Sequence, residues 1–309
     1  MSYPHIIDSS SVGFSSKQQL SNYIERNKDS IYEKLYEVGA ILFRGFNLNN
    51  SSDFEESVKF FDKELKNYIG GDSPRNKVTE KVYTSTSYPP EATISMHHEK
   101  SYSNNYPRYV YFFCEIPPTA GGETPILDSR EIYNILDSDI IDNFAKKKLK
   151  YVMNLHDGVG FGRSWQEAFE VDNKEMLEKI LTNLNLTYFW KPNGLLYIEE
   201  VVSPIIRHPI TGDNVFFSQA DQWHPSNLDE EILSSMQEII PEDDFYHNCT
   251  YGDDSKLEVK NLTKIRQIIN NQRKIFSWQK GDFLMLDNII SMHGRLPFSG
   301  ERKILVAMT

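Results

Sequence analysis

The chain has 309 residues, of which 39% are hydrophobic and 13% aromatic, and this composition can build a substantial core. Its formal net charge of −11 argues against a nucleic-acid partner, because phosphate binding depends on Lys and Arg. Only two cysteines, no secretory signal at the N-terminus and no apolar run long enough to cross a bilayer predict a cytoplasmic protein without a membrane span.

The N-terminal third alternates helical and strand-like stretches. Residues 1–15 indicate a loose strand or arm, and apolar residues recur at helical spacing over 16–36. A short strand is expected over 38–46, followed by a helix that begins after Asn50 and reaches Leu65. The Gly-, Ser- and Pro-rich segment 67–95 is expected to be loop, suited to a flexible wall over a substrate or to a plain linker.

The remaining elements predict a mainly β protein with helices. We expect strands over 108–116, 274–278, 283–287 and 302–308, short strands within 151–165 and 187–225, and helices over 128–150, 166–183, 228–240 and 257–272. Short strands with interspersed helices are typical of a β-sandwich or jelly roll, an α+β arrangement with flanking helices. We expect one domain over 1–309, with helical insertions around 128–183 and 228–272.

The stretch Met96-His97-His98-Glu99 carries the strongest chemical signal. In an extended strand His97 and Glu99 point to the same face, and His293 can supply one more imidazole from a distant strand. Two histidines and one carboxylate on one face form the facial triad of non-haem iron enzymes, which leaves the other metal positions open. A lone H-x-E tripeptide is a weak signal, because most are surface polar residues or structural histidines.

Several further motifs carry a family resemblance. They are H-x-E-x-S-Y at 97–102, P-R-Y-x-x-F-x-C-x-x-P-P at 107–118, G-G-E-T-P-x-x-D-S-R at 121–130, W-x-x-G-D-x-L-x-L-D-N at 278–288 and H-G-R-x-P-F-x-G-x-R at 293–302. In this order, they resemble the taurine dioxygenase/clavaminate synthase-like superfamily, and within it the branch of the syringomycin aspartyl hydroxylase. The resemblance extends from about residue 38 to the end of the chain.

The resemblance implies a double-stranded β-helix (jelly-roll) core and an Fe(II)- and 2-oxoglutarate-dependent oxygenase. His97, Glu99 and His293 would be the catalytic iron ligands, and Thr124 and Arg302 would hold the 2-oxoglutarate carboxylate. A guanidinium is a rigid fork matched to a carboxylate, and the neighbouring Lys303 would face the other side of the strand. Many members of the superfamily have a second arginine four residues later. Because that position is Val306 here, the choice between Arg302 and Arg295 stays open.

Other polar residues divide between substrate contact and structure. Asn288, Arg295 and Gln219 are candidates for contact with a polar substrate, with a structural role as the alternative for each. His98 is expected behind the ligands or at the surface. We interpret three further histidines as structural, because none has a partner at the spacing of a ligand motif. They are His208, His224 and His247.

The resemblance points to hydroxylation of an unactivated C–H bond in an amino acid during specialised metabolite biosynthesis, such as that of an antibiotic. The substrate would be the free amino acid or one tethered to a peptidyl carrier protein. The acidic chain suits a cationic amino acid, although net charge says little about a pocket. The alternatives are desaturation or cyclisation by the same chemistry, a zinc hydrolase with the same ligands, and a jelly-roll binding protein without turnover.

Overall fold

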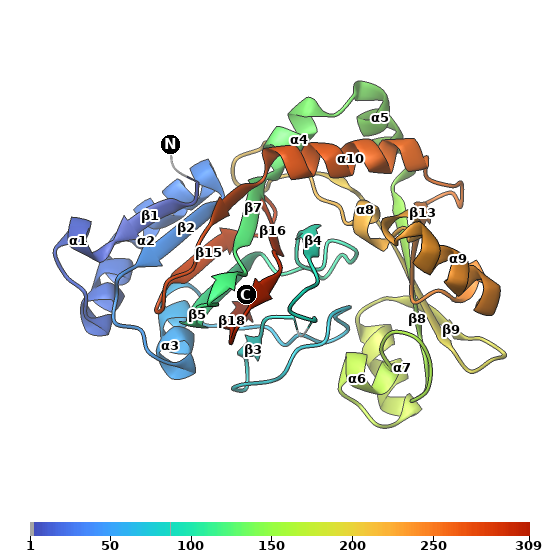
Figure 1. The fold of residues 1–309 in the computed structure, drawn as a ribbon, viewed down its shortest axis with the longest axis horizontal. Helices are drawn as coiled ribbons and strands as arrows, with labels where there is room; N and C mark the ends of the chain where they lie inside the picture. The colour runs from blue at the N-terminus through green and yellow to red at the C-terminus, as the bar shows by residue number, and fades with distance from the viewer. Residues whose placement is uncertain (1–2, 87) are drawn as a thin grey trace.

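Two sheets face each other at the centre of the molecule (Figure 1). The computed structural model describes residues 3–86 and 88–309. The larger sheet contains, in spatial order, β1 (His5–Asp8), β2 (Ala40–Arg44), β15 (Phe283–Asp287), β5 (Tyr109–Ile116), β18 (Lys303–Met308) and β3 (Tyr83–Thr84). The smaller sheet contains β14 (Lys274–Phe276), β7 (Thr124–Asp128), β16 (Ser291–Arg295) and β4 (Ile94–His97), and a short pair is formed by β17 (Phe298–Ser299) and β6 (Ala120–Gly121).

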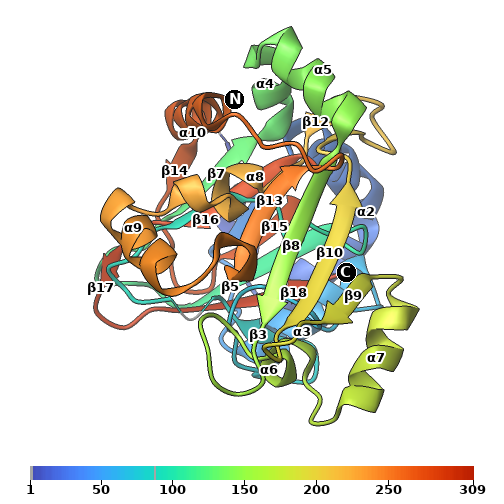
Figure 2. The same cartoon turned by 90° about the vertical axis from the view of Figure 1, so that its right-hand side faces the viewer.

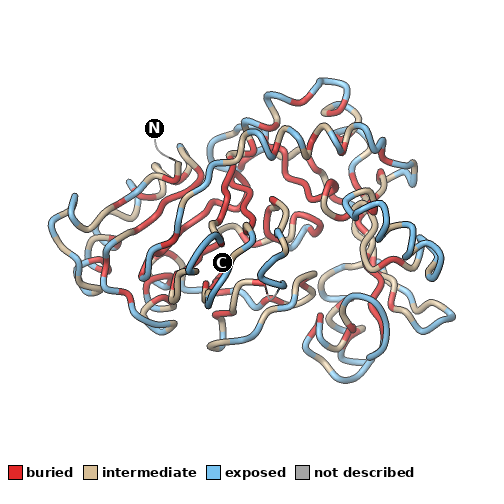
Figure 3. Tube along the Cα trace, in the orientation of Figure 1, coloured by how far each residue is buried: buried red, intermediate tan, exposed pale blue. Residues whose placement is uncertain are grey.

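Alternating side chains of the larger sheet fill two separate cores. In β18, Ile304 and Val306 belong to the core between the sheets, whereas Leu305 and Ala307 belong to the core on the outer face. Residues of β7 and Trp278 close the inner core from the smaller sheet. The central strands are therefore buried on both faces, as the red tube at the centre of Figure 3 shows. This arrangement of two packed sheets is the expected jelly-roll core.

Helices of the N-terminal segment cover the outer face of the larger sheet. They are α1 (Ser9–Val12), α2 (Lys17–Val38) and α3 (Ser51–Phe61). Ser16 and Asn50 are the N-caps of α2 and α3, and their side chains accept hydrogen bonds from backbone N–H groups three residues later. The predicted helices at these two places are confirmed, and α3 ends four residues earlier than expected.

A second body of structure packs beside the jelly roll. Its four strands lie side by side in Figure 2 in the order β13 (His247–Tyr251), β8 (Leu149–Leu155), β10 (Leu196–Val202) and β9 (Thr187–Trp190), next to a hairpin of β11 (Ile205–Arg207) and β12 (Asn214–Phe216). The helices are α4 (Ser129–Ile135), α5 (Ser138–Lys147), α6 (Trp165–Phe169), α7 (Lys174–Asn183), α8 (Ala220–Trp223), α9 (Glu230–Ile239) and α10 (Val259–Gln272), with 3-10 turns η1 (Pro225–Asn227) and η2 (Glu242–Asp244). In the described parts of the chain, no helix combines the length and hydrophobicity that a bilayer crossing needs.

Two helix predictions in this region were wrong. The expected helix over 128–150 is two helices, because Leu136 adopts an extended conformation between them, and residues from Leu149 onward form β8. The expected helix over 166–183 is also divided, because Glu170 has a positive φ of 55° and ends α6. The expected insertions also contain strands: β8 matches the short strand expected within 151–165, whereas β13 was not expected. The period of the apolar residues did not reveal these interruptions.

Candidate active site

His97 and His293 lie opposite each other on neighbouring strands. β4 and β16 pair antiparallel, with His97 and His293 in register and their ring centroids 4.4 Å apart. The carboxylate of Glu99 lies 4.0 Å from His293 Nε2. One ligand atom from each of the three residues lies within 4.8 Å of the others, which is the spacing that a shared metal ion requires.

Glu99 reaches this position from a turn and not from the strand. β4 ends at His97, so the expectation that His97 and Glu99 share one strand face was wrong. The side chain of Asn288 fixes the turn: its amide oxygen accepts from Glu99 N at 2.8 Å, and its amide nitrogen donates to Glu99 O at 2.9 Å and to Pro107 O at 2.8 Å. The loop between β15 and β16 thereby positions Glu99.

Gln219 fixes the next part of the same loop. Its side-chain oxygen accepts from Ser101 N at 3.1 Å and from Ser101 Oγ at 2.9 Å, and the residue is buried. His98 is also buried, with Nε2 2.8 Å from Ser129 Oγ. The polar groups of Asn288 and Gln219 that were candidates for substrate contact thus bond to the chain around Glu99.

Arg75 contacts the candidate metal ligand Glu99, and no sequence motif pointed to it. Its guanidinium donates to Glu99 Oε2 at 2.7 Å, and the two side chains are 4% and 2% exposed. It also lies over the ring of Tyr68, 4.1 Å from the centroid. Arg75 belongs to the Gly- and Pro-rich segment before β3, where neither spacing nor hydrophobic period distinguishes one arginine from another.

The donor atoms fit a ferrous ion. The Nδ1 group of His97 lies 2.8 Å from Ser95 O, so an N–H there donates to the carbonyl and leaves Nε2 free as a lone-pair donor. Burial lowers the pKa of His293 well below its usual value, so its imidazole is neutral and able to bind a metal. Two imidazoles and one carboxylate, with no fourth side-chain donor of this kind in the described cluster, suit Fe(II) with open positions.

A pocket beside the two histidines fits a dicarboxylate. Arg75, Thr124, Arg295 and Arg302 line it together with His97 and His293. Arg302 is partly buried, and burial lowers its pKa to about 10. Its hydrogen bonds go to Gly122 O at 3.1 Å and Ser85 Oγ at 3.4 Å, both uncharged. A partly buried guanidinium with only neutral hydrogen-bond partners favours an anionic ligand.

Their hydrogen bonds distinguish the two arginines that were candidates for binding 2-oxoglutarate, Arg295 and Arg302. Arg295 donates to the carbonyl oxygens of Tyr88, Pro89 and Ala92, so its guanidinium holds the loop before β4. Lys303 pairs with Glu115 at 2.7 Å near the surface. The hydroxyl of Thr124 accepts from Trp278 Nε1 at 3.0 Å, which fixes it within the pocket.

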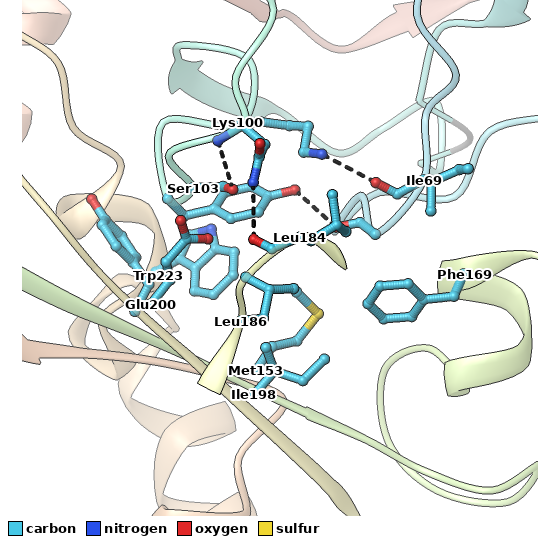
Figure 4. A pocket seen from close by; sticks show the side chains of 14 residues that line it. Ile69, Lys100, Ser103, Met153, Phe169, Leu184, Leu186, Ile198, Glu200 and Trp223 are labelled. Carbon is cyan, nitrogen blue, oxygen red and sulfur yellow. Dashed lines mark hydrogen bonds between the residues drawn. The ribbon is translucent and has the colours of Figure 1, made fainter. Parts of the chain in front are cut away.

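Two further hollows lie on the side of the inserted sheet. The larger is a cavity of about 380 Å³, here called the chamber, lined in part by Ile94 and Ser95 of β4. The smaller, about 40 Å³, is the apolar pocket of Figure 4, which lies between the loop after Glu99 and strands β8 and β10. Here Lys100 Nζ donates to Ile69 O at 3.1 Å and so ties two loops together. Of these two hollows, the chamber is the larger, and it borders β4.

Comparison with known proteins agrees with this geometry. The sequence matches the family described as "Taurine catabolism dioxygenase TauD, TfdA family" over residues 9–309. The chain belongs to this family. The protein is therefore an Fe(II)- and 2-oxoglutarate-dependent dioxygenase, with the TauD-like jelly-roll fold that the sequence motifs predicted.

Two curated relatives extend the TauD/TfdA assignment. The chain is 33% identical to the dapdiamide synthesis protein DdaC of Enterobacter agglomerans, over 90% of this chain and 84% of that protein. It is 28% identical to a clavaminate synthase-like protein of Arabidopsis thaliana, over 92% of this chain and 86% of the relative.

Solved structures share the fold at low sequence identity. One is AAD-2 in complex with Mn(II) and N-oxalylglycine, with a TM-score of 0.52, 11% identity, and coverage of 91% of this chain and 85% of that chain. Another is asparagine oxygenase in complex with Fe(II), hydroxyasparagine and succinate, with a TM-score of 0.52, 11% identity, and coverage of 95% and 78%.

Proposed function

We propose that this dioxygenase hydroxylates an unactivated C–H bond of an amino acid, free or tethered to a peptidyl carrier protein, in the biosynthesis of a specialised metabolite. The observation that carries the proposal is the convergence of His97, Glu99 and His293 beside Arg302. The similarity to a dapdiamide synthesis protein supports a biosynthetic role. The chamber beside β4 offers space for an amino-acid substrate.

We assign each residue of the site a role. His97, Glu99 and His293 would hold Fe(II), and Arg302 with Thr124 would hold the distal carboxylate of 2-oxoglutarate. When bound, iron and 2-oxoglutarate supply an oxidation in which dioxygen and the keto acid are consumed, succinate and carbon dioxide are released, and the C–H bond becomes C–OH. The protein contributes position and exclusion of water.

Residues around the ligands would keep the triad in place. Ser95 O accepts the Nδ1–H of His97 and thereby orients its ring, and Asn288 fixes the backbone of Glu99. Arg75 would hold one carboxylate oxygen of Glu99 and limit rotation of the side chain. Because Glu99 occupies a coordination place that a halide would need, the site favours hydroxylation over halogenation.

Formation of succinate tests this proposal. The protein supplied with Fe(II), 2-oxoglutarate and oxygen should release succinate, and His97→Ala and Glu99→Ala should abolish the release. His5→Ala, in β1 at the edge of the larger sheet, is the matched control and should retain it. A screen of amino acids by mass then separates the products: hydroxylation adds one oxygen, whereas desaturation or cyclisation removes two hydrogens. A zinc hydrolase would act equally well without oxygen, and that result would contradict the proposal.

A further inference from the structure

The chamber lies directly against the strand that carries His97. Ile94 lines both the chamber and the pocket of Arg302, and Ser95, whose carbonyl accepts from His97, also lines the chamber. Its volume of about 380 Å³ falls in the range of roughly 300–1,000 Å³ that is usual for small-molecule sites. Because Ile94 borders both spaces, a molecule bound in the chamber would lie next to the pocket that holds the metal ligands.

Asp72 gives the chamber a negative charge. It is the one Asp, Glu, Lys or Arg among the described residues that line the cavity. Oδ1 of its carboxylate accepts from the hydroxyls of Tyr68 at 3.1 Å and Ser73 at 3.2 Å. Two histidines also line the wall, and burial lowers the pKa of His224 and His247 to about 4, so both are neutral at physiological pH. No Lys or Arg belongs to the described wall, although the charge of Arg75 behind it also acts on Asp72.

The rest of the wall is aromatic and has unused hydrogen-bonding groups. Tyr88, Phe161 and Tyr246 line the chamber, and aromatic faces attract cations. Trp223 stacks on His247 with ring centroids 3.9 Å apart. Trp223 Nε1 and His247 Nε2 are both buried, and the described residues provide no hydrogen-bond partner for either atom. Buried polar groups without partners favour a polar ligand at this place.

A short chain of contacts joins Asp72 to the candidate metal ligands. The Tyr68 hydroxyl donates to Asp72, Arg75 lies over the Tyr68 ring, and the same arginine donates to Glu99. The loop that holds Asp72 in the chamber therefore also holds Arg75 against the triad. A ligand seated on Asp72 would contact the segment that orders the site.

We propose that the chamber binds the substrate through a positively charged nitrogen, an ammonium or a guanidinium, which pairs with Asp72 against the aromatic wall. This proposal rests on the proposed function and adds the chemical class of its substrate. A carboxylate beside aromatic faces favours a cation over a neutral group of the same size, because only the cation forms an ion pair with Asp72.

Binding of matched pairs tests the proposal. The protein is loaded with Mn(II) and 2-oxoglutarate, and titration calorimetry measures three pairs that differ by one charged nitrogen: L-lysine and N6-acetyl-L-lysine, L-arginine and L-citrulline, L-asparagine and Nα-acetyl-L-asparagine. We expect the cationic member of at least one pair to bind at least tenfold more tightly, and Asp72→Asn to reduce that preference to less than threefold. Glu80→Gln, an exposed acid in the same segment, should keep it.

Other outcomes overturn the proposal. If no cationic member binds more tightly than its partner, or if Asp72→Asn retains the preference, the chamber does not select a cation through Asp72. A merely structural role for Asp72 would weaken all ligands equally and leave the ratio unchanged. Release of succinate without added substrate reports the oxygenase chemistry separately, so failure of the cation preference with succinate still formed refutes only this inference.

Discussion

Replacing Arg75 with methionine removes the positive partner of Glu99 while keeping a long side chain in its place. Both groups are almost fully buried, with 4% and 2% of the side chains exposed, so solvent cannot replace the guanidinium. Breaking a buried pair by removing one partner costs about 3–5 kcal/mol. With an entropy of unfolding of about 2.1 cal/mol/K for each of the 309 residues, the melting temperature of the metal-free protein should fall by about 5–8 °C.

A metal ion should reverse much of this loss. If Glu99 is a ligand, a bound divalent cation replaces the charge that Arg75 supplied. The metal should therefore stabilise Arg75→Met by more than it stabilises wild type. Differential scanning fluorimetry with and without Mn(II) measures both effects. We expect saturating Mn(II) to recover at least half of the melting-temperature loss of Arg75→Met relative to wild type.

Arg44→Met is the matched control. Arg44 pairs with the fully buried Asp282 at 2.6 Å in the larger sheet, away from the candidate ligands. Its removal should lower the melting temperature, and Mn(II) should then raise it only as much as in wild type. The reasoning is refuted if metal-free Arg75→Met melts like wild type, or if Mn(II) stabilises both variants to the same extent.

Three further predictions follow from individual contacts. Arg302→Met should raise the KM for 2-oxoglutarate about 10- to 150-fold, because a charged hydrogen bond contributes roughly 1.5–3 kcal/mol. Lys303→Met should leave the KM unchanged, and steady-state succinate release at varied 2-oxoglutarate checks both. Asn288→Ala should weaken Mn(II) binding about 10- to 100-fold by releasing the Glu99 turn, and a calorimetric titration showing wild-type affinity would contradict this. Burial raises the pKa of Asp221 to about 6 although Arg266 opposes the shift. Because this folded-state pKa exceeds the unfolded value of about 3.9, stability is lost as the pH rises from about 4 to 6. Asp221→Asn should therefore be about 2–3 kcal/mol more stable than wild type above pH 7 and equal to it below pH 4, as urea unfolding at several pH values would show.

The sequence predicted those parts of the fold that depend on local pattern. Ile304, Leu305 and Val306 of the predicted final strand place successive side chains in the two cores. The start of α3 was recognisable because a cap acts within three residues. In the inserted sheet, β8, β9 and β10 lie largely where short strands were expected, whereas β13 was missed because it shows no clear period.

Long-range pairing explains what could and could not be foreseen at the site. His97 and His293 could be matched because the motif resemblance links two segments nearly two hundred residues apart, and β4 and β16 place them side by side. Arg75 could not, because its partner Glu99 is fixed by the path of an irregular loop. The side chains of Asn288 and Gln219 were noticed as candidates for substrate contact, but only coordinates show that they bond to the Glu99 loop.

Co-crystallisation with Mn(II) and N-oxalylglycine, an analogue of 2-oxoglutarate, tests the central claim most directly. The account predicts one metal ion held by His97, Glu99 and His293, with the distal carboxylate of the analogue on Arg302 and Thr124. Anomalous scattering from manganese at any other place, or a fourth protein ligand closing the metal site, would contradict it.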